Sequence, residues 1–190
     1  RYVLAELQYR IGLCISHDLT QKCVVEDEQV DCKEVVTHAF ALAVEYDDSH
    51  ESAKHMLATM TADSTMKRAS NDYVKSLFDD YAANFEHSLV QELGYSGYER
   101  LRRAFDRTFD GNPPMFDLVI AAGCGTGLVG EQFRNVSQTL IGVDLSEAIL
   151  QQAIQARPHL YDEVLAGDMI QVFEIRKPIS VIIAGDSYIY

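Results

Sequence analysis

Residues 116–127 read FDLVIAAGCGTG, an apolar run that ends in three closely spaced glycines. An uninterrupted apolar run predicts a parallel strand that is covered by helices on both faces. Glycines directly after such a strand allow a sharp backbone turn and the close approach of a ligand. A helix is expected to begin at about Thr126, with Leu128, Val129 and Phe133 on one face, and the free N–H groups of a helix start attract anionic or polar groups. The stretch therefore predicts a site for a nucleotide-type ligand.

The spacing of the glycines narrows the class of ligand. Gly123, Gly125 and Gly127 follow the pattern G-x-G-x-G. Dinucleotide-binding folds use G-x-G-x-x-G, which would place the third glycine at position 128, where this chain has Leu128. The pattern disfavours a nicotinamide-dependent oxidoreductase, but a single glycine motif is weak without further segments.

Three further apolar segments strengthen the prediction of a ligand site, because each of them ends in an aspartate. LIGVD (140–144), VLAGD (164–168) and ISVIIAGD (179–186) each predict a strand. Asp144 lies about twenty residues past the first glycine, where a second strand presents an acid to ribose hydroxyls. Ser146 is the expected N-cap of the next helix, whose apolar face carries Ala148, Ile149, Ala153 and Ile154. With the strand order 3-2-1-4, the glycine turn and all three aspartates meet at one edge of the sheet.

These segments resemble the first half of the class I S-adenosylmethionine-dependent methyltransferases. AAGCGTG is similar to their glycine motif, GVDLS to their acidic strand end, AGDM to the segment beside adenine, and IIAGDSYIY to the strand that borders the transferred methyl. A more specific resemblance is to predicted methyltransferases with tetratricopeptide repeats, which have a helix similar to LFDDYAANFE (77–86) followed by Leu-Gly-Tyr (93–95). Two positions depart from the family: Ala121 stands where an acid is usual, and Ser96-Gly97-Tyr98 stands where Arg-x-Pro is usual.

The resemblance implies S-adenosylmethionine as the cofactor and gives each site residue a role. The glycine turn would adjoin the methionyl group and ribose, Asp144 would accept from the two ribose hydroxyls, and Asp168 would accept from the adenine amine. Asp186 would steer the nucleophile or take its proton. The full cofactor set is Gly123, Cys124, Gly125, Gly127, Asp144, Leu145, Asp168, Met169 and Tyr81. Each aspartate has an alternative role as a helix N-cap or a turn residue.

Composition excludes several classes of function. The net charge of −13 argues against a nucleic-acid partner, since phosphate binding requires clustered Lys and Arg. No apolar run approaches the length of a membrane span, and no signal-peptide pattern opens the chain, although it starts at Arg1 rather than Met. A cytoplasmic location is expected.

The four cysteines show no obvious disulfide framework. Cys14, Cys23 and Cys32 are evenly spaced, but zinc sites favour close pairs, so no metal site is expected. A reducing intracellular setting is the default for such a pattern. Cys124 lies inside the glycine turn, where a small space-filling residue is favoured over a nucleophile.

Residues 1–62 predict a helical region of tetratricopeptide-like type. Residues 1–16 carry Val3, Leu4, Leu7, Ile11, Cys14 and Ile15 at helical spacing, and further amphipathic helices carry Val35, Val36, Ala39, Phe40 and Ala43, then Ala53, Met56, Leu57 and Met60. Ile11-Gly12 and Val36-x₃-Phe40 fit the repeat pattern, with an acidic insertion at about 18–31 between them. Within it, Glu26-Asp27-Glu28 is expected to be a solvated loop, with a site for a basic partner as the alternative.

The second domain is expected over residues 72–190. It begins with one long amphipathic helix, from 72 to about 93, that Gly94 ends. Its aromatic side chains are expected in the core, and the family resemblance gives the alternative that Tyr81 and Phe85 cover the cofactor.

The sequence therefore predicts an α/β, Rossmann-like methyltransferase sheet preceded by a helical region. The expected activity is methyl transfer to an unidentified protein or small-molecule acceptor, with the N-terminal helices as a possible surface for a protein partner. A non-catalytic interaction module is the alternative, suggested by Ala121. The family's sheet has seven strands and these residues account for four, so we expect the catalytic domain to be C-terminally truncated, with little activity.

Overall fold

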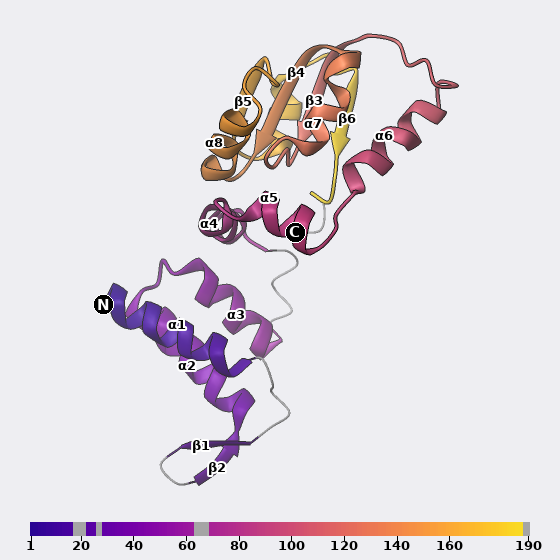
Figure 1. The fold of residues 1–190 in the computed structure, drawn as a ribbon. Coiled ribbons are helices and arrows are strands. Elements are labelled where there is room, and N and C mark those ends of the chain that lie inside the picture. Colours follow the sequence, from indigo (N-terminus) through magenta and orange to yellow (C-terminus); the bar gives the residue numbers. More distant parts are fainter. Residues whose placement is uncertain (17–21, 26–27, 63–68, 188–190) are drawn as a thin grey trace. The chain divides into compact units, whose positions relative to one another are not determined.

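The computed structural model describes residues 1–16, 22–25, 28–62 and 69–187. The chain divides into two compact units, Arg1–Tyr73 and Val74–Tyr190, with the boundary inside α4 (Asn71–Tyr81) (Figure 1). The first unit is helical with a small hairpin, and the second is built on a parallel sheet.

Three helices form the core of the first unit: α1 (Tyr2–Ser16), α2 (Cys32–Tyr46) and α3 (Glu51–Thr61). As predicted, α2 buries one stripe, and its side chains join small residues of the neighbouring helices in a core of Ala5, Val36, Ala39, Phe40, Ala43 and Ala53. A Cβ on Gly12 would lie 2.5 Å from Cε1 of Phe40, so only glycine lets α1 approach α2 this closely. This contact joins two positions of the repeat pattern, and the repeat assignment itself stays a prediction.

The sequence predicts an apolar stripe at helical spacing on α1, but the structure leaves most of this stripe exposed. Val3 is 76% exposed, Leu4 48%, Leu7 52% and Ile11 37%. Among the α1 positions whose burial the structure describes, the buried ones are Ala5 and Gly12, and both are small residues.

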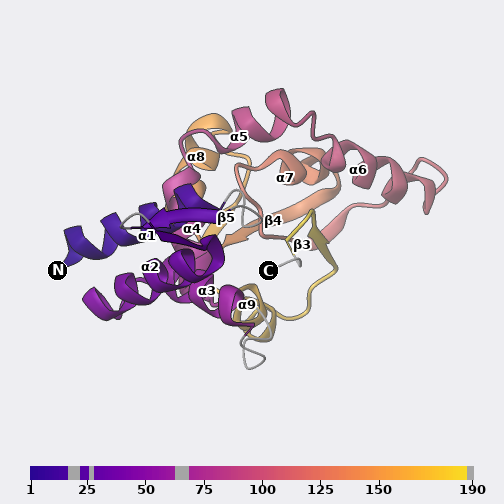
Figure 2. The same cartoon turned by 90° about the horizontal axis from the view of Figure 1, so that it is seen from below.

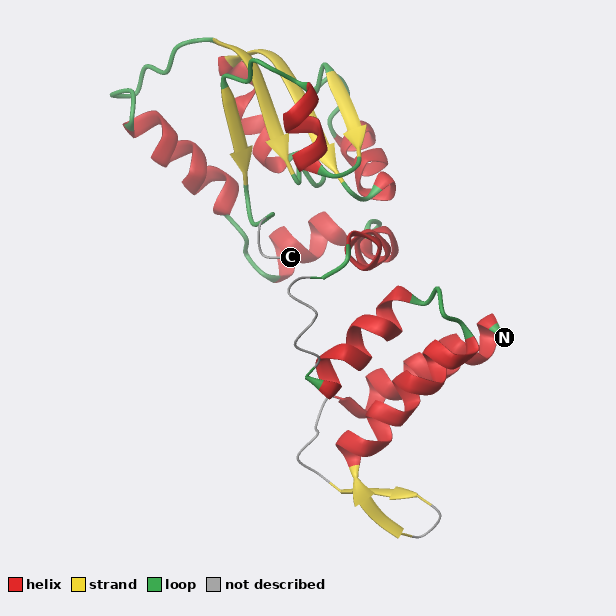
Figure 3. Ribbon diagram, turned by 180° about the vertical axis from the view of Figure 1, so that it is seen from behind, coloured by secondary structure: helices red, strands yellow, loops and turns green. Residues whose placement is uncertain are grey.

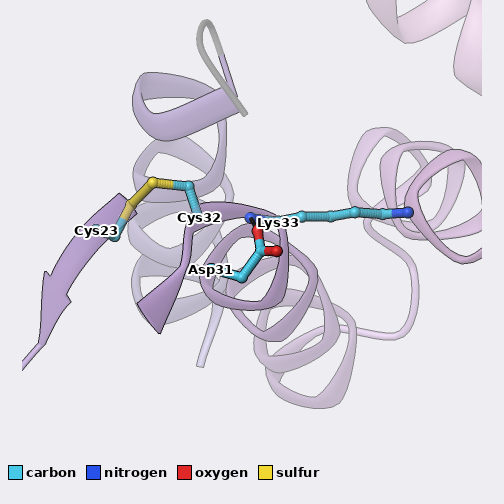
Figure 4. The surroundings of a disulfide bond; sticks show 4 residues. All are labelled: Cys23, Asp31, Cys32 and Lys33. Atoms are coloured by element: carbon cyan, nitrogen blue, oxygen red, sulfur yellow. Dashed lines mark hydrogen bonds between the residues drawn. A yellow bond between two sulfur atoms is a disulfide. The ribbon is translucent and has the colours of Figure 1, made fainter. Parts of the chain in front are cut away.

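The segment expected as an acidic loop contains a β-hairpin. β1 (Lys22–Val25) pairs antiparallel with β2 (Glu28–Asp31), while Glu26 and Asp27 lie outside the described residues. A disulfide joins Cys23 to Cys32, at the first turn of α2, and the Asp31 side chain accepts from the Lys33 amide to cap that helix (Figure 4). The cysteine spacing indicated no disulfide framework, and that expectation is wrong. The hairpin folds the chain back on itself and so brings Cys23 next to Cys32.

The second unit contains a parallel sheet in the predicted order 3-2-1-4. Its strands are β3 (Phe116–Ala122), β4 (Ser137–Asp144), β5 (Glu163–Ala166) and β6 (Val181–Ala184), arranged β5-β4-β3-β6. Figure 3 shows them as arrows that point the same way. Ala122 pairs with Val143 and with Ala184, and Asp144 pairs with Ala166, so the four strand ends lie along one edge.

Helices cover both faces of this sheet, as the apolar strands predict. On one face, Val119 and Ala121 pack with residues of α6 (Gly97–Arg107), α7 (Leu128–Phe133) and α8 (Glu147–Ala156). On the other face, Ile120 and Val143 pack with α9 (Met169–Ile175), which Figure 2 labels. Ile154, expected on the core face of α8, is 42% exposed, because five residues turn a helix by roughly 140° from Ile149.

The helix expected over residues 72–93 is broken. α4 ends at Tyr81, a turn follows at residues 82–84, and α5 (Phe85–His87) continues into the π-helix η1 (Ser88–Glu92). Asn84 stands at the N-cap of α5, and asparagine favours caps and turns over helix interiors. Gly94 has φ +64° and ends the segment, as predicted.

Candidate cofactor site

The glycine turn follows β3 directly and needs glycine for its backbone. Gly123, Gly125 and Gly127 have φ +58°, +55° and +101°, in the left-handed region that favours glycine. The Cys124 amide donates to the Val143 carbonyl at 2.9 Å, which ties the turn to the end of β4. Gly127 is the N-cap of α7, which starts at Leu128, two residues later than expected.

Asp144, at the end of β4, binds the glycine turn through its carboxylate. Its Oδ2 accepts from the Gly125 amide at 3.0 Å, and its Oδ1 accepts from the Ser146 amide at 3.0 Å. A carboxylate has about four lone-pair positions, so roughly two remain for a ligand. Ser146 caps α8, as predicted, by accepting from the Ile149 amide. The turn and the acid of the sequence prediction therefore form one hydrogen-bonded unit.

Burial is the main influence on the charge of Asp144. Burial raises the pKa of its carboxyl above the ordinary value, while the amides of Ser146, Gly125 and Leu145 oppose the increase and Asp79 adds to it. Desolvation disfavours the charged form, and amide donors favour it. A ligand that donates hydrogen bonds to Asp144 would stabilise the ionised form further.

Asp168 lies at the same edge, one strand away. The Gly167 amide donates to the Asp144 carbonyl at 2.9 Å. Asp168 is the N-cap of α9, and its Oδ1 accepts from the Ile170 amide at 2.8 Å, which is the structural role that the sequence left open. Met169 packs against the core beneath the sheet, and Leu145 is half-buried.

Asp186 follows β6 with a backbone that non-glycine residues rarely adopt, at φ +57°. It is hydrogen-bonded to the Tyr95 hydroxyl, and burial together with Asp186 raises the pKa of Tyr95 to about 12. The Ser187 hydroxyl donates to the Ala122 carbonyl at 2.8 Å. Residues 185–187 therefore cross from the end of β6 to the end of β3, beside the glycine turn.

The aromatic side chains of α4 and α5 lie at the same turn. A Cβ on Gly125 would lie 3.5 Å from Cε1 of Phe85, so the Phe85 ring sits over the middle of the glycine turn. Tyr81 is 42% exposed and meets the edge of the Phe85 ring at a centroid distance of 6.0 Å. The structure thus places the Phe85 ring against the glycine turn, and the Tyr81 ring against the Phe85 ring.

Cys124 and Ala121 point into the protein. Cys124 is 5% exposed, and burial raises the pKa of its thiol well above the usual range, which disfavours a nucleophilic thiolate. Ala121 is 1% exposed and packs in the core on the α7 side of the sheet.

Sequence reasoning missed a hydrogen bond that holds α4 to α8 and an ion pair that holds α5 to α8. Asp79 accepts from the Ser146 hydroxyl at 2.6 Å, at the start of α8. Arg157, at the end of α8, donates to both oxygens of Glu86 at 2.8 and 3.0 Å. Both acids occur in the LFDDYAANFE motif, but spacing alone does not show which distant group a carboxylate meets.

The described residues contain no group of three or more His, Cys, Asp or Glu side chains that could hold a metal ion. Within the same residues, no helix combines the length and the apolar character that crossing a membrane requires.

Comparisons with known proteins give similarities of limited extent. No protein-family model matches the chain, and no curated protein matches it. Similar solved structures include an S-adenosylmethionine-dependent methyltransferase from Clostridium acetobutylicum, with TM-score 0.44 and 19% identity over 55% of this chain and 43% of that one. Another is phosphoethanolamine N-methyltransferase 1 from Haemonchus contortus, with TM-score 0.44 and 15% identity over 60% of this chain and 25% of that one.

A third is the magnesium protoporphyrin IX methyltransferase from Synechocystis PCC 6803 with bound S-adenosylmethionine, with TM-score 0.42 and 18% identity over 62% of each chain. The chain spans less than two thirds of the length of each of these three proteins.

Proposed function

We propose that this chain binds S-adenosylmethionine and belongs to a methyltransferase that acts on a protein or small-molecule acceptor. The observation that carries the proposal is the bond between the glycine turn and Asp144 at the edge of a parallel sheet. Open parallel sheets bind ligands beyond the carboxyl ends of their strands, beside the point where strand order reverses. Here that point lies between β3 and β6, and the turn follows β3.

Asp144 suits the ribose of an adenosyl group. Its two oxygens each keep lone-pair capacity after accepting from Gly125 and Ser146, and a ribose offers two adjacent hydroxyl donors. The other sequence-based roles are retained as part of the proposal. The methionyl portion would lie against the glycine turn, at Gly123, Cys124, Gly125 and Gly127. The adenine would lie beside Leu145, Asp168 and Met169. Tyr81 would cover the open side of the site.

Methyl transfer from a sulfonium is a single displacement. The acceptor's lone pair forms the new bond to the methyl carbon while the carbon–sulfur bond breaks, leaving the thioether S-adenosylhomocysteine. The protein's task is to align the reacting atoms and to receive a proton from an acceptor that must lose one. Asp186, beside the glycine turn and hydrogen-bonded to Tyr95, is the proposed proton acceptor or steering group.

Ala121 favours a second candidate function, a cofactor-binding module without catalysis. The family's acid is absent at this position, and the alanine is packed in the core. The exposed apolar stripe of α1 is the surface that we propose for a protein partner in either case. The Cys23–Cys32 disulfide favours an oxidising compartment, so the cytoplasmic location expected from the cysteine pattern is not part of this proposal.

Calorimetric titration with S-adenosylhomocysteine and with a nicotinamide dinucleotide tests the proposal. We expect binding of the first only. Asp144→Ala should raise its dissociation constant at least about tenfold, because charge-assisted hydrogen bonds are worth about 1.5–3 kcal/mol each. Asp117→Ala, on an exposed residue of β3, is the control. Failure of the unaltered chain to bind S-adenosylhomocysteine, or an unchanged constant in Asp144→Ala, would overturn it.

A further inference from the structure

Asp79 reaches from α4 to the start of α8, where the proposed ribose site lies. Its Oδ1 accepts from the Ser146 hydroxyl at 2.6 Å and from the Ala148 amide at 3.3 Å, and its Oδ2 accepts from the Lys75 ammonium at 2.7 Å. Burial raises the pKa of Asp79, but the hydrogen bonds from Lys75 and Ser146 outweigh burial and lower it below the ordinary value. Asp79 is therefore ionised at neutral pH.

Ser146 connects Asp79 to Asp144. It is completely buried, and each of its polar groups has a separate partner. Its amide donates to Asp144 Oδ1 at 3.0 Å, its hydroxyl oxygen accepts from the Ile149 amide at 3.0 Å, and its hydroxyl hydrogen is directed to Asp79. Asp144 thus accepts from the amide and Asp79 from the hydroxyl of the same serine.

The cap of α8 does not need Asp79, because Ser146 accepts from Ile149 with its own oxygen. What Asp79 determines is the direction of the Ser146 hydroxyl hydrogen. A buried hydroxyl without an acceptor costs about 1–3 kcal/mol, so without Asp79 it would turn to another acceptor. The carboxylate already bonded to the Ser146 main chain is Asp144, whose free lone pairs are the ones proposed for the ribose.

We infer that Asp79 is a positioning residue that keeps the Ser146 hydroxyl away from Asp144 and so reserves the Asp144 lone pairs for a ribose. This inference rests on the proposed function. It concerns a residue 65 positions from Asp144 in the sequence that would touch no part of the cofactor, and it gives the α4 helix a role in ligand affinity.

Two ligands distinguish positioning from general stabilisation: S-adenosylhomocysteine and its analogue that lacks both ribose hydroxyls. Asp79→Ala should weaken binding of the first about tenfold, the loss of roughly one charge-assisted bond, and of the analogue less than about twofold. Asp79→Asn should bind within about threefold of the unaltered chain, because the amide oxygen can still accept from Ser146. Asp80→Ala, the exposed neighbour on the same helix, is the matched control and should change neither constant.

The outcomes separate the two proposals. If the unaltered chain does not bind S-adenosylhomocysteine, the proposed function fails. If it binds and Asp79→Ala leaves both constants unchanged, or weakens both ligands equally, Asp79 has no positioning role. If Asp79→Ala does not fold, Asp79→Glu takes its place, because it keeps the charge but displaces the carboxylate oxygens. Asp79→Glu must then weaken the binding of S-adenosylhomocysteine and leave the binding of the analogue without ribose hydroxyls unchanged.

Discussion

The ion pair between Arg157 and Glu86 gives a quantitative prediction for the second unit. Arg157 closes α8, and its side chain is only 15% exposed. It donates to both oxygens of Glu86, to Glu131 at 2.9 Å and to the Thr126 carbonyl at 3.2 Å. One guanidinium therefore connects α5, α7 and the glycine turn.

The magnitude follows from the geometry. Two charge-assisted hydrogen bonds to Glu86 would be worth about 3–6 kcal/mol if fully buried. Water can solvate part of the Glu86 side chain, which is 35% exposed, and this reduces the net loss to roughly 2 kcal/mol. The Glu131 side chain is 54% exposed and adds only about 0.3 kcal/mol. For a unit of this size, Arg157→Ala should lower Tm by about 8 °C.

A double-mutant cycle measured by calorimetric unfolding is the assay. Arg157→Ala and Glu86→Ala should each cost about 2 kcal/mol, and the double variant should cost about 1.5 kcal/mol less than their sum, because each single variant already breaks the pair. Arg103→Ala is the control, since Arg103 lies 3.7 Å from Glu99 with both side chains exposed, and it should cost less than about 0.5 kcal/mol. Additive effects of Arg157→Ala and Glu86→Ala within about 0.5 kcal/mol would refute the reasoning.

The pH dependence gives an independent check. Burial raises the pKa of Glu86, but the hydrogen bonds from Arg157 outweigh it and lower the pKa below its ordinary value. A carboxyl whose pKa is lowered on folding stabilises the protein above its unfolded pKa and loses that stabilisation as pH falls through its folded pKa. The stability difference between the unaltered chain and Arg157→Ala should be constant from about pH 6 to 8 and shrink below about pH 4.5.

Two further predictions concern the glycine turn and the disulfide. Gly127→Ala should destabilise the chain by about 2–3 kcal/mol in urea unfolding, because the backbone there has φ +101° and the new Cβ would lie 2.8 Å from a Leu160 methyl. Gly111→Ala is the control: its backbone has φ +80° but the space around it is open, so it should cost only about 1 kcal/mol. Equal losses in the two variants would contradict the steric explanation. Cys32→Ser should lower the free energy of unfolding, measured without reductant, by about 2–3 kcal/mol, because it removes the disulfide. Cys14→Ser, on a free cysteine, should leave the free energy of unfolding unchanged. A count of four free thiols in the denatured, unreduced chain would show that the disulfide does not form.

The sheet was predictable because burial on both faces leaves a direct mark on the sequence. Each strand of the second unit reads as an apolar run that ends in glycine or aspartate, and the order 3-2-1-4 follows from that set. The cap at Ser146 was also predictable, because capping is a local interaction.

The features that sequence reasoning missed depend on contacts between distant residues. The β1–β2 hairpin lies in a polar, acidic segment with no alternating pattern, and the bond of Cys23 to Cys32 follows from that hairpin. In α1, periodicity predicted an apolar stripe, but Val3, Leu4, Leu7 and Ile11 are exposed, and the buried positions are Ala5 and Gly12, which a periodicity of large apolar residues does not mark. The break at residues 82–84 separates the two carboxylates that anchor opposite ends of α8.

The glycines of the turn also illustrate why a motif alone is weak evidence for a ligand. A Cβ on Gly123 would lie 2.4 Å from Ser187 Oγ, and a Cβ on Gly127 would meet Leu160, so the protein's own side chains already require glycine at both positions. Gly125 is less constrained, since its nearest neighbour is the Phe85 ring at 3.5 Å. Internal packing and left-handed φ therefore account for much of the G-x-G-x-G pattern without any ligand. The Asp144 carboxylate is different: Asp144 is half-buried, desolvation raises the pKa of its carboxyl, and the amides of Gly125 and Ser146 donate to one oxygen each and leave lone pairs for a ligand at the sheet edge. The proposal of a ribose-binding site consequently depends on Asp144 more than on the glycines that first suggested it.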